Sequence, residues 1–331
     1  MKAIIIGGGA AAEIHVEVLS QLGIELACVC DKNLAAAKAL AERFSAKATD
    51  DMDAALMWDA DFCVICTPSG THPELAVKAL NAGKNVIVEK PLGLSVSDCD
   101  RVIAAQNASG KICAPISQLR FSETYRSVKK CLSEGALGKI VMASLSMKYY
   151  RSPEYYRGSW KGTKALDGGE LFNQGIHGLD IMCGLLGKPV SVTGRVCTRF
   201  HSIEAEDTAV ATVEFADGTL AAVDSSTAVG CAKPRRFEIC GTDGMLVMEE
   251  DRIVLVEGAA LKTSGESLYN GSRDPRNIGT DLHCRIYENI ISAFRGETAL
   301  EYTVADAAQT VRLICGIYES SETGRAVSVE R

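Results

Sequence analysis

The sequence predicts an α/β fold in two parts: a doubly wound parallel sheet, followed by an α+β region with a large, mostly antiparallel open sheet. Residues 1–118 alternate short apolar runs with helical patterns, which is typical of a parallel sheet covered by helices. Beyond them the chain carries long alternating runs joined by Asp-Gly turns, which indicate antiparallel hairpins. The length of 331 residues suits two domains, which we place at 1–118 and 119–331.

In the first region each strand is a short apolar run, and a glycine ends two of the helices, Gly23 and Gly83. The predicted strands and helices alternate regularly, as a parallel sheet requires. In chain order they are strand 2–6, helix 10–22, strand 25–30, helix 34–44, strand 61–66, helix 73–82, strand 85–88, helix 97–108 and strand 111–117.

In the second region the strands alternate apolar and polar residues, and the turns at 216–218 and 242–244 contain Asp-Gly. The polar, Gly- and Ser-rich stretch 262–279 predicts a long loop. The predicted elements are helix 123–134, strand 140–150, helix 171–186, strands 190–198, 208–214, 219–226, 236–240 and 245–256, and helices 281–295 and 304–323.

Composition limits the function classes. With 35 Lys and Arg against 42 Asp and Glu, the net charge is −7, which argues against a nucleic-acid binder. No apolar run reaches the ~20 residues of a membrane helix. The N-terminal apolar run stops at Ile6 and meets three glycines, so we predict a cytoplasmic protein without a secretory signal.

The thirteen cysteines are scattered singly through apolar stretches, which is typical of small buried side chains in a reducing compartment. Cys63 and Cys66 form a C-x-x-C pattern inside a predicted strand. Because strand side chains alternate, residues three apart point to opposite faces. We therefore expect neither a redox pair nor a metal site there, and we predict no metal elsewhere.

A glycine-rich turn follows the first strand and opens the first helix. Residues 7–12, Gly-Gly-Gly-Ala-Ala-Ala, fit the pattern G-x-G-x-x-A of dinucleotide-binding domains. Gly7 permits the tight turn, Gly9 lets the backbone approach a pyrophosphate, and Ala12 allows close packing of helix on strand. The helix N-terminus adds N–H donors and a partial positive charge for the phosphates.

Asp31 ends the second predicted strand, 19 residues after Ala12. A carboxylate there accepts hydrogen bonds from the adenosine ribose and repels a 2′-phosphate, which favours NAD over NADP. The neighbouring Lys32 is also a candidate cofactor contact, and because a lysine suits a phosphate, NADP stays open.

Two further segments end at the carboxyl edge of the predicted sheet, where ligands of parallel sheets bind. The loop 67–72 contributes Thr67, Pro68 and His72 as candidate cofactor contacts, although His72 before a proline also suits a helix cap. Glu89 and Lys90, which end the strand at 85–88, are candidates at the same edge.

Three segments together resemble one family. They are Glu89-Lys90-Pro91, the stretch GGELFNQGIHGLD at 168–180, and the C-terminal run YESSETGR at 318–325. The sequence resembles the Gfo/Idh/MocA oxidoreductases, the family of glucose–fructose oxidoreductase and inositol dehydrogenase, over essentially its whole length. The resemblance implies a Rossmann domain, and a catalytic group that matches Lys90, Asn173 and His177 here. The frequent aspartate of the family is Asn173 in this chain, although asparagine also occurs in the family.

The residues themselves suit hydride transfer from a secondary alcohol. Asn173 and His177 are four residues apart on a predicted helix, and therefore share a face. Histidine is the side chain whose ordinary pKa lies nearest neutral pH, so His177 suits the base that takes the hydroxyl proton, with Lys90 as the alternative in the absence of a carboxylate at 173. Lys90 suits stabilisation of the alkoxide, and Asn173 suits orientation of the hydroxyl. Asp180 is a candidate either to hold the imidazole or to form a structural salt bridge.

The segment 149–162, rich in aromatic and cationic residues, precedes the candidate catalytic helix. Aromatic faces stack on sugars and arginine binds carboxylate or phosphate, although ordinary packing by tyrosines is the alternative. The segment resembles members that oxidise sugars or nucleotide-linked amino sugars, such as the UDP-N-acetylhexosamine 3-dehydrogenases. The candidate substrate contacts are Arg120, Tyr149, Arg157, Trp160 and Asn173.

We predict an NAD(P)-dependent dehydrogenase that acts on a CH–OH group of a sugar or cyclic polyol. Two alternatives use the same residues: an NAD-using, redox-neutral glycosidase and a non-catalytic NAD-binding sensor, which Asn173 in place of aspartate favours. An open antiparallel sheet leaves a face to cover, and family members commonly associate through that sheet. We therefore predict a homodimer or homotetramer.

Overall fold

The computed structural model describes residues 1–258 and 280–330. The loop predicted at 262–279 lies outside the described residues. By Cα proximity the chain divides into two compact units. The first comprises Met1–Gln118 and the described part of Ser272–Ala308, and the second comprises the described parts of Leu119–Gly271 and Gln309–Arg331.

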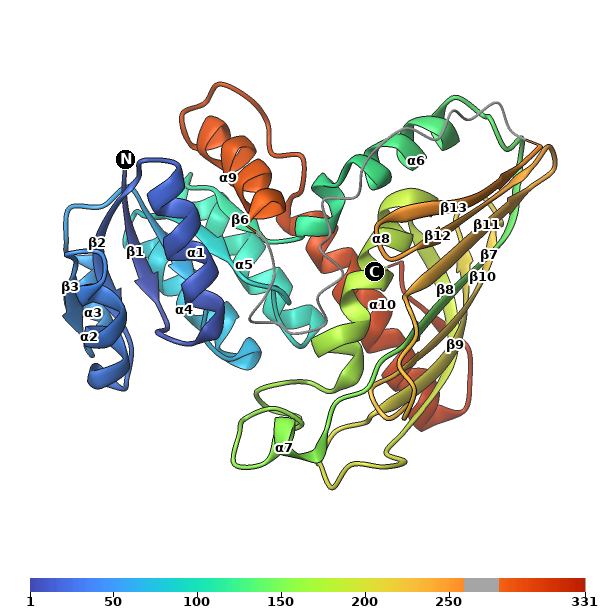
Figure 1. Ribbon diagram of the computed structural model, residues 1–331, viewed down its shortest axis with the longest axis horizontal. Coiled ribbons are helices and arrows are strands. Elements are labelled where there is room, and N and C mark those ends of the chain that lie inside the picture. The colour runs from blue at the N-terminus through green and yellow to red at the C-terminus, as the bar shows by residue number, and fades with distance from the viewer. Residues whose placement is uncertain (259–279, 331) are drawn as a thin grey trace. The chain divides into compact units, whose positions relative to one another are not determined.

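The first unit is built on a six-stranded parallel sheet in the order β3-β2-β1-β4-β5-β6 (Figure 1). This is the doubly wound Rossmann order, in which the chain changes direction between β1 and β4. The strands are β1 (Lys2–Ile6), β2 (Glu25–Cys30), β3 (Lys47–Thr49), β4 (Phe62–Ile65), β5 (Asn85–Val88) and β6 (Cys113–Pro115).

The apolar runs form the central strands because both faces of this sheet are covered. All four residues of β4 have no exposed surface, and Ala3, Ile4 and Ile5 of β1 are equally buried. The parallel sheet is therefore confirmed. The helices are α1 (Ala10–Gln21), α2 (Leu34–Glu42), α3 (Met52–Leu56), α4 (His72–Asn81), α5 (Val96–Ser109) and α9 (Asp281–Phe294), with a 3-10 turn at Ser69–Thr71.

Helix α9 corrects the predicted domain division. We assigned all of 119–331 to the second domain, whereas residues 280–308 belong to the first unit. The reason is that α9 packs on α1, where the Tyr287 hydroxyl lies 2.7 Å from Nδ1 of the buried His15. Sequence periodicity shows that α9 has an apolar face but not which unit it covers.

The second unit carries an eight-stranded sheet in the order β13-β12-β11-β7-β10-β9-β8-β14. Only β7 and β10 pair in parallel among its described strands, so the predicted mostly antiparallel sheet is confirmed. Its strands are β7 (Ile140–Lys148), β8 (Pro189–Cys197), β9 (Thr208–Phe215), β10 (Leu220–Ser226), β11 (Arg236–Gly241), β12 (Met245–Glu249), β13 (Arg252–Glu257) and β14 (Val327–Ser328).

Helices line one face of this sheet. In Figure 1, α8 and α10 lie along it, and no described helix covers the other face. That other face carries exposed apolar side chains, among them Met142, Val210 and Leu220. The helices are α6 (Glu123–Ser133), α7 (Pro153–Tyr156), α8 (Ile176–Leu186) and α10 (Val304–Thr323), with a 3-10 turn at Gln118–Phe121 and a π turn at Leu171–Gly175.

Two element predictions were wrong in detail. The strand expected at 245–256 is two strands, β12 and β13, because the chain reverses where Glu250 takes a φ of +51°. The helix expected at 171–186 begins with a π turn before α8. The short elements β3, α3, α7 and β14 were not predicted, since each is too brief to show a period.

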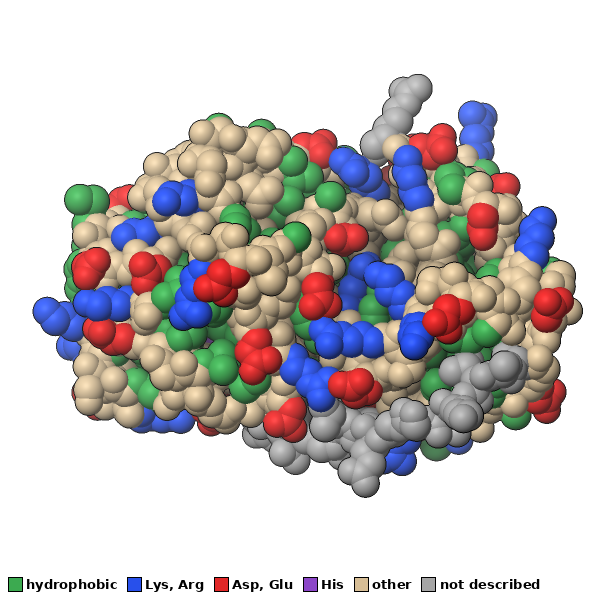
Figure 2. All heavy atoms as spheres, turned by 90° about the horizontal axis from the view of Figure 1, so that it is seen from above, with side chains coloured by type: hydrophobic (Ala, Val, Ile, Leu, Met, Phe, Trp, Pro, Cys, Tyr) green, Lys and Arg blue, Asp and Glu red, His purple; other side chains and the backbone are tan. Residues whose placement is uncertain are grey.

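The charged surface and the Cys63–Cys66 pattern were both considered from the sequence. Figure 2 shows acidic and basic side chains interspersed on one face of the molecule. No helix among the described residues has the length and apolar character needed to cross a bilayer. Cys63 and Cys66 are buried and not joined by a disulfide, and burial raises the pKa of the Cys63 thiol to about 12. That thiol therefore stays protonated and is a poor metal ligand.

Candidate functional site

The glycine turn joins β1 to α1 at the point where the strand order reverses. Gly7 has a φ of +104°, and its N–H donates to the Cys30 carbonyl at 2.8 Å. A Cβ at Gly7 would lie 2.8 Å from the Cys66 carbonyl oxygen, so a side chain would strain the backbone and collide with β4's end. The turn therefore requires glycine at this position.

The N-terminus of α1 is open. Gly9 is its N-cap, is exposed and makes no side-chain cap, and a Cβ built on it meets nothing within 4 Å. Ala12 is completely buried and lets the helix approach the sheet. The first N–H groups of α1 are thus presented to an approaching anion, as a pyrophosphate site needs.

Asp31 follows β2 at the same edge. Its Oδ2 accepts from the Gly8 N–H at 2.6 Å and its Oδ1 from the Asn33 N–H at 2.7 Å. The carboxylate is therefore fixed beside the glycine turn, while Lys32 is exposed. Turn, open helix end and fixed acid together fit the phosphates and ribose of a dinucleotide.

The loop after β4 contains three of the candidate cofactor contacts, Thr67, Pro68 and His72. Thr67 and Thr71 share a 2.7 Å hydrogen bond, and the Pro68 carbonyl accepts from Thr71, so this loop is held by its own side chains. His72 is buried, and its ring nitrogens lie 2.8 Å from the carbonyl oxygens of Pro91 and Thr67. Both nitrogens are thereby engaged by the main chain, which suits the structural alternative for His72, and its cofactor contact stays a prediction.

The partly exposed Glu89 pairs with the buried His15 next to Lys90. Glu89 Oε1 lies 2.9 Å from His15 Nε2, and Glu89 Oε2 accepts from the Lys90 backbone N–H at 3.1 Å. Burial opposes ionisation of Glu89, but the hydrogen bond and charge of His15 outweigh it and lower the Glu89 pKa to about 2. Burial also opposes ionisation of His15, yet Cys66, Tyr287 and Glu89 raise its pKa well above the usual value. The ion pair fixes the backbone at Lys90, and Glu89 serves this pair rather than pointing to a ligand.

In the second unit, Glu206 determines where the candidate catalytic helix begins. Its Oε1 accepts from the Leu171 N–H at 2.9 Å and from the Tyr318 hydroxyl at 2.7 Å. A Cβ on Gly169, whose φ is +113°, would lie only 1.9 Å from Glu206 Oε2. The Gly-Gly pair is therefore needed so that this carboxylate can reach the helix start.

Asn173 lies in the π turn, and His177 in the first turn of α8. The Asn173 Nδ2 donates to Asp167 Oδ1, and its Oδ1 accepts from Gln174 Nε2 at 2.6 Å. The Tyr155 hydroxyl also donates to Asn173 Oδ1 at 3.4 Å. The two candidates are brought near one another, and the wider π turn, a feature common at functional sites, offsets them from a regular α-helical face.

Glu170 is a buried carboxyl beside this turn. Ser225 donates to its Oε1 at 2.6 Å, while its Oε2 has no hydrogen-bond partner among the described residues. Burial, helped by the charges of Glu206 and Asp207, raises the Glu170 pKa to about 8. Burial likewise raises the Glu206 pKa to about 7. Glu170 is therefore mostly neutral at pH 7.

Two arginines predicted to contact substrate have other partners. Arg120 is buried, and its Nε and a terminal nitrogen donate to the Asp180 carboxylate at 2.8 Å. Asp180 also accepts from Thr310, so it forms the structural salt bridge that was one of its two predicted roles. Arg157 is an exposed partner of Glu154, with nitrogen and oxygen 3.5 Å apart. Neither geometry fits the predicted substrate contact.

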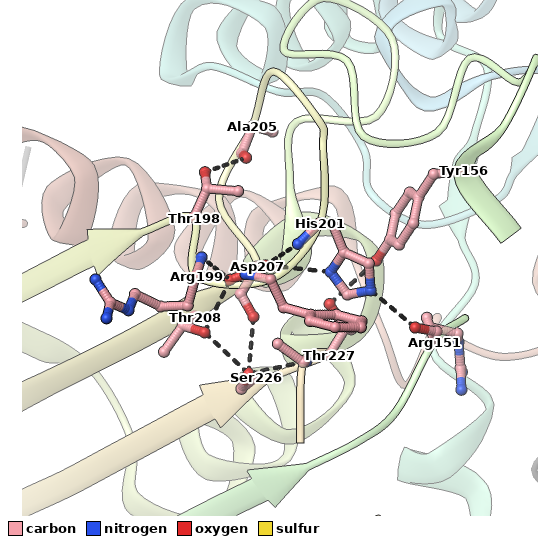
Figure 3. Close-up of polar contacts among 12 residues, drawn as sticks. Arg151, Tyr156, Thr198, Arg199, His201, Ala205, Asp207, Thr208, Ser226 and Thr227 are labelled. Atoms are coloured by element: carbon pink, nitrogen blue, oxygen red, sulfur yellow. Dashed lines mark hydrogen bonds and ion pairs between the residues drawn. The ribbon is translucent and has the colours of Figure 1, made fainter. Parts of the chain in front are cut away.

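The segment 149–162 is anchored by a polar network (Figure 3). Asp207 accepts from the backbone N–H groups of Arg199, Phe200 and His201, and lies 3.1 Å from His201 Nδ1. His201 Nε2 lies 2.8 Å from the Arg151 carbonyl oxygen. Figure 3 shows the His201 ring between Asp207 and Arg151, which ties the start of the segment to the sheet.

The residues that contact Asn173 from this segment were not predicted individually. Tyr155 reaches Asn173, and Arg151 donates to the neighbouring Gln174 at 2.7 Å. The predicted Tyr149 continues from β7 through backbone bonds to Ser226 and Val229, and Trp160 is half-buried. The aromatic and cationic composition identified the segment, but which of its side chains turn toward Asn173 depends on the α7 turn.

Two family models match the chain. The one described as "Oxidoreductase family, NAD-binding Rossmann fold" matches residues 1–116, and the one described as "GFO/IDH/MocA C-terminal domain" matches residues 125–247. The chain belongs to the GFO/IDH/MocA oxidoreductase family. The resemblance carried by Lys90, Asn173 and His177 is thereby confirmed at the level of the family, as is a dinucleotide-binding Rossmann domain.

Relatives within this family are named as dehydrogenases. D-glucoside 3-dehydrogenase of Escherichia coli is 27% identical, with 99% of this chain and 97% of that protein covered. scyllo-Inositol 2-dehydrogenase (NADP(+)) of Bacillus subtilis is 24% identical, with 82% and 79% covered. The WlbA dehydrogenase of Bordetella pertussis, solved with NADH and UDP-GlcNAcA, is 27% identical, with a TM-score of 0.91 and 99% and 97% covered. The chain is an oxidoreductase that acts on CH–OH groups, and its cofactor is a nicotinamide dinucleotide.

The raised Glu170 pKa predicts a pH dependence of stability. Between about pH 4.5 and pH 8 the folded state keeps a proton that the unfolded chain releases, so stability falls as pH rises through this window. Glu170→Gln, which is neutral at every pH, removes this part of the decline. Between pH 5 and pH 8.5 the free energy of unfolding of the variant, relative to that of wild type, therefore rises by on the order of 3 kcal/mol.

Thermal unfolding at pH 5 and pH 8.5 measures this difference. Glu123→Gln, at an exposed glutamate on α6, is the control and follows wild type. If the stability of wild type and of Glu170→Gln changes equally between the two pH values, Glu170 is ionised in the folded state.

Proposed function

We propose that this chain oxidises a secondary alcohol of a sugar or cyclic polyol, with NAD as the preferred cofactor and a nucleotide-linked amino sugar as the finer substrate class. The observation that carries the proposal is the fixed amide of Asn173 in the π turn, four residues before His177 in the first turn of α8, in a family oxidoreductase. UDP-GlcNAcA in the similar Bordetella structure supports the finer class. We also keep the prediction that the protein acts in the cytoplasm.

The chemistry divides among three side chains. NAD, when bound, accepts the hydride. We assign His177 as the base that removes the hydroxyl proton, and Lys90 as the cation that stabilises the developing alkoxide. Asn173 orients the hydroxyl, and it cannot act as a base because an amide does not take up a proton at neutral pH.

The surroundings of Asn173 suit this orienting role. Its Nδ2 donates to Asp167 and its Oδ1 accepts from Gln174, so both ends of the amide are fixed. Asp167 is buried and also accepts from the Gly162 N–H at 2.7 Å. A fixed amide next to a carboxylate supports a positioned substrate hydroxyl rather than a binding surface without catalysis.

Substitution of Lys90 and His177 tests the assignment. We expect Lys90→Met and His177→Gln each to lower kcat by about 10²–10⁴-fold, because each removes a group needed in the transition state. NADH affinity changes little in His177→Gln, which leaves the glycine turn and Lys90 in place. The measurement is NADH formation from NAD with a panel of polyols, hexoses, uronic acids and UDP-hexosamines, beside NADH titration.

The exposed Lys130→Met, on α6, is the control and keeps wild-type turnover. Unchanged turnover in Lys90→Met and His177→Gln would refute the assignment. Release of an aglycone without net NADH would favour the redox-neutral glycosidase, and NADH binding without turnover of any sugar would favour the sensor.

Asp31 is expected to determine cofactor preference. Asp31→Ala removes charge-assisted hydrogen bonds to the ribose and weakens NADH binding by about tenfold or more. It also removes repulsion of a 2′-phosphate, so the ratio of NADPH to NADH affinity rises. Fluorescence titration of both cofactors measures the ratio, and Lys38→Ala, at an exposed lysine on α2, is the control. An unchanged ratio would place the ribose elsewhere.

We also propose that the chain forms a homodimer or homotetramer through the uncovered face of the second sheet. Leu220 and Met142 are cross-strand neighbours on β10 and β7, and both are more than half exposed. Light scattering at micromolar concentration is expected to give a multiple of 35.2 kDa, and Leu220→Lys to shift the mass toward the monomer. Met57→Lys, at an exposed methionine of the first unit, leaves the mass unchanged. A wild-type monomer would refute this proposal.

A further inference from the structure

Two cations flank one aromatic ring beside Asn173. The Lys161 Nζ lies 3.8 Å from the centroid of the Tyr155 ring, and the Arg151 Cζ lies 5.5 Å from it. The Tyr155 hydroxyl in turn contacts Asn173. We call Arg151, Tyr155 and Lys161 the Tyr155 cluster. It lies within a single hydrogen bond of a candidate catalytic residue.

The positive charge of the Tyr155 cluster is not balanced by an ion pair. Neither Arg151 nor Lys161 lies within 4.0 Å of a carboxylate among the described residues. The nearby Asp167 is engaged by the Gly162 N–H and by Asn173. Burial lowers the pKa of Lys161, and the charge of Arg151 lowers it further, against the pull of Asp167. Two like charges are thus held together in a partly desolvated place.

The arginine is positioned rather than mobile. Its terminal nitrogens donate to Gln174 Oε1 at 2.7 Å and to the Tyr150 carbonyl at 3.2 Å. Its Nε is buried and has no hydrogen-bond partner among the described residues. Its backbone is tied to the sheet through His201 and Asp207 (Figure 3). A preorganised arginine with an unused donor is what recognition of an oxyanion requires.

Packing alone explains the arrangement poorly. A cation on an aromatic face contributes ~0.5–1 kcal/mol at exposed sites, and one cation suffices for that contact. The charge of Asp167 offsets the repulsion between Arg151 and Lys161, but the burial of Lys161 and of the unpaired Arg151 Nε still adds a desolvation cost. A negatively charged ligand offsets this cost, and a cationic site of this kind raises the local concentration of anions.

We propose that Arg151 and Lys161 form an anion subsite beside Asn173, which binds a carboxylate or phosphate group carried on the sugar ring of the substrate. This inference rests on the proposed function, because it concerns the substrate of the same site. Asn173 contacts the hydroxyl that reacts, and the subsite holds a charged substituent within the span of one sugar ring. The subsite thereby distinguishes sugar acids and sugar phosphates from neutral sugars.

The test compares three ligands that share one ring. Isothermal titration of the full chain with saturating NADH measures the affinities of D-glucose, D-glucuronate and D-glucose 1-phosphate. We expect at least one of the anions to bind about tenfold or more tightly than glucose. Preference for glucuronate identifies a ring carboxylate, and preference for glucose 1-phosphate identifies a phosphate attached to the ring.

Variants connect the preference to the cluster. Lys161→Gln and Arg151→Gln are each expected to reduce the anion preference about tenfold while the affinity for glucose stays unchanged. Lys161→Arg keeps the charge and retains the preference. Lys164→Gln, at an exposed lysine three residues away, is the matched control and retains it too. Thermal unfolding of each variant separates loss of binding from loss of folding.

The proposal is overturned if neither anion binds more tightly than glucose, or if the preference survives in both glutamine variants. Because the readout is binding, it is separate from the test of the proposed function. Anion preference without turnover would support the subsite and refute the dehydrogenase. Turnover of neutral sugars without anion preference would support the dehydrogenase and refute the subsite.

Discussion

Buried carboxylates hold the backbone at both candidate catalytic segments, and the chemistry of the site depends on this. Glu89, ionised against His15, binds the N–H of Lys90 in the first unit. Glu206 binds the N–H of Leu171, where the turn that carries Asn173 begins. A buried carboxylate needs partners that offset its desolvation, and backbone N–H groups at strand and helix ends are such partners. These hydrogen bonds fix the main chain next to the reactive side chains.

Glu89 and Glu206 differ in charge, although neither is freely exposed. His15 supplies a cation that keeps Glu89 ionised, whereas neutral donors and neighbouring acids leave Glu206 and Glu170 with raised pKa values. The second unit therefore carries carboxyl groups that keep a proton near neutral pH, in the chain next to Asn173, whereas the first unit has an ion pair next to Lys90. This difference follows from the partner of each group and not from its depth in the protein.

Cofactor and substrate elements are built in different ways. The glycine turn and Asp31 use backbone geometry at the end of parallel strands, which any sequence with this pattern reproduces. The Tyr155 cluster uses side chains from a short turn anchored by His201 and Asp207, so it varies with individual residues. Substrate choice in a fold shared by many enzymes is expected to reside in such a turn.

The sequence by itself determined the parallel sheet, the antiparallel sheet, the glycine turn and the family, because each depends on local periodicity or on spacing within one segment. It placed His177 in a helix, whereas Asn173 lies in the π turn before that helix. It did not show the protein partners of His72 and Arg120, because whether a polar side chain meets a buried partner depends on residues distant in the chain. Tertiary structure alone decided that Asp180 pairs with Arg120, that α9 packs on α1, and that Arg151 and Lys161 meet around Tyr155. The first two contacts join segments distant in the chain, and the third depends on how the segment 149–162 folds back on itself. The energies of all three arise only when packing removes water from between the partners.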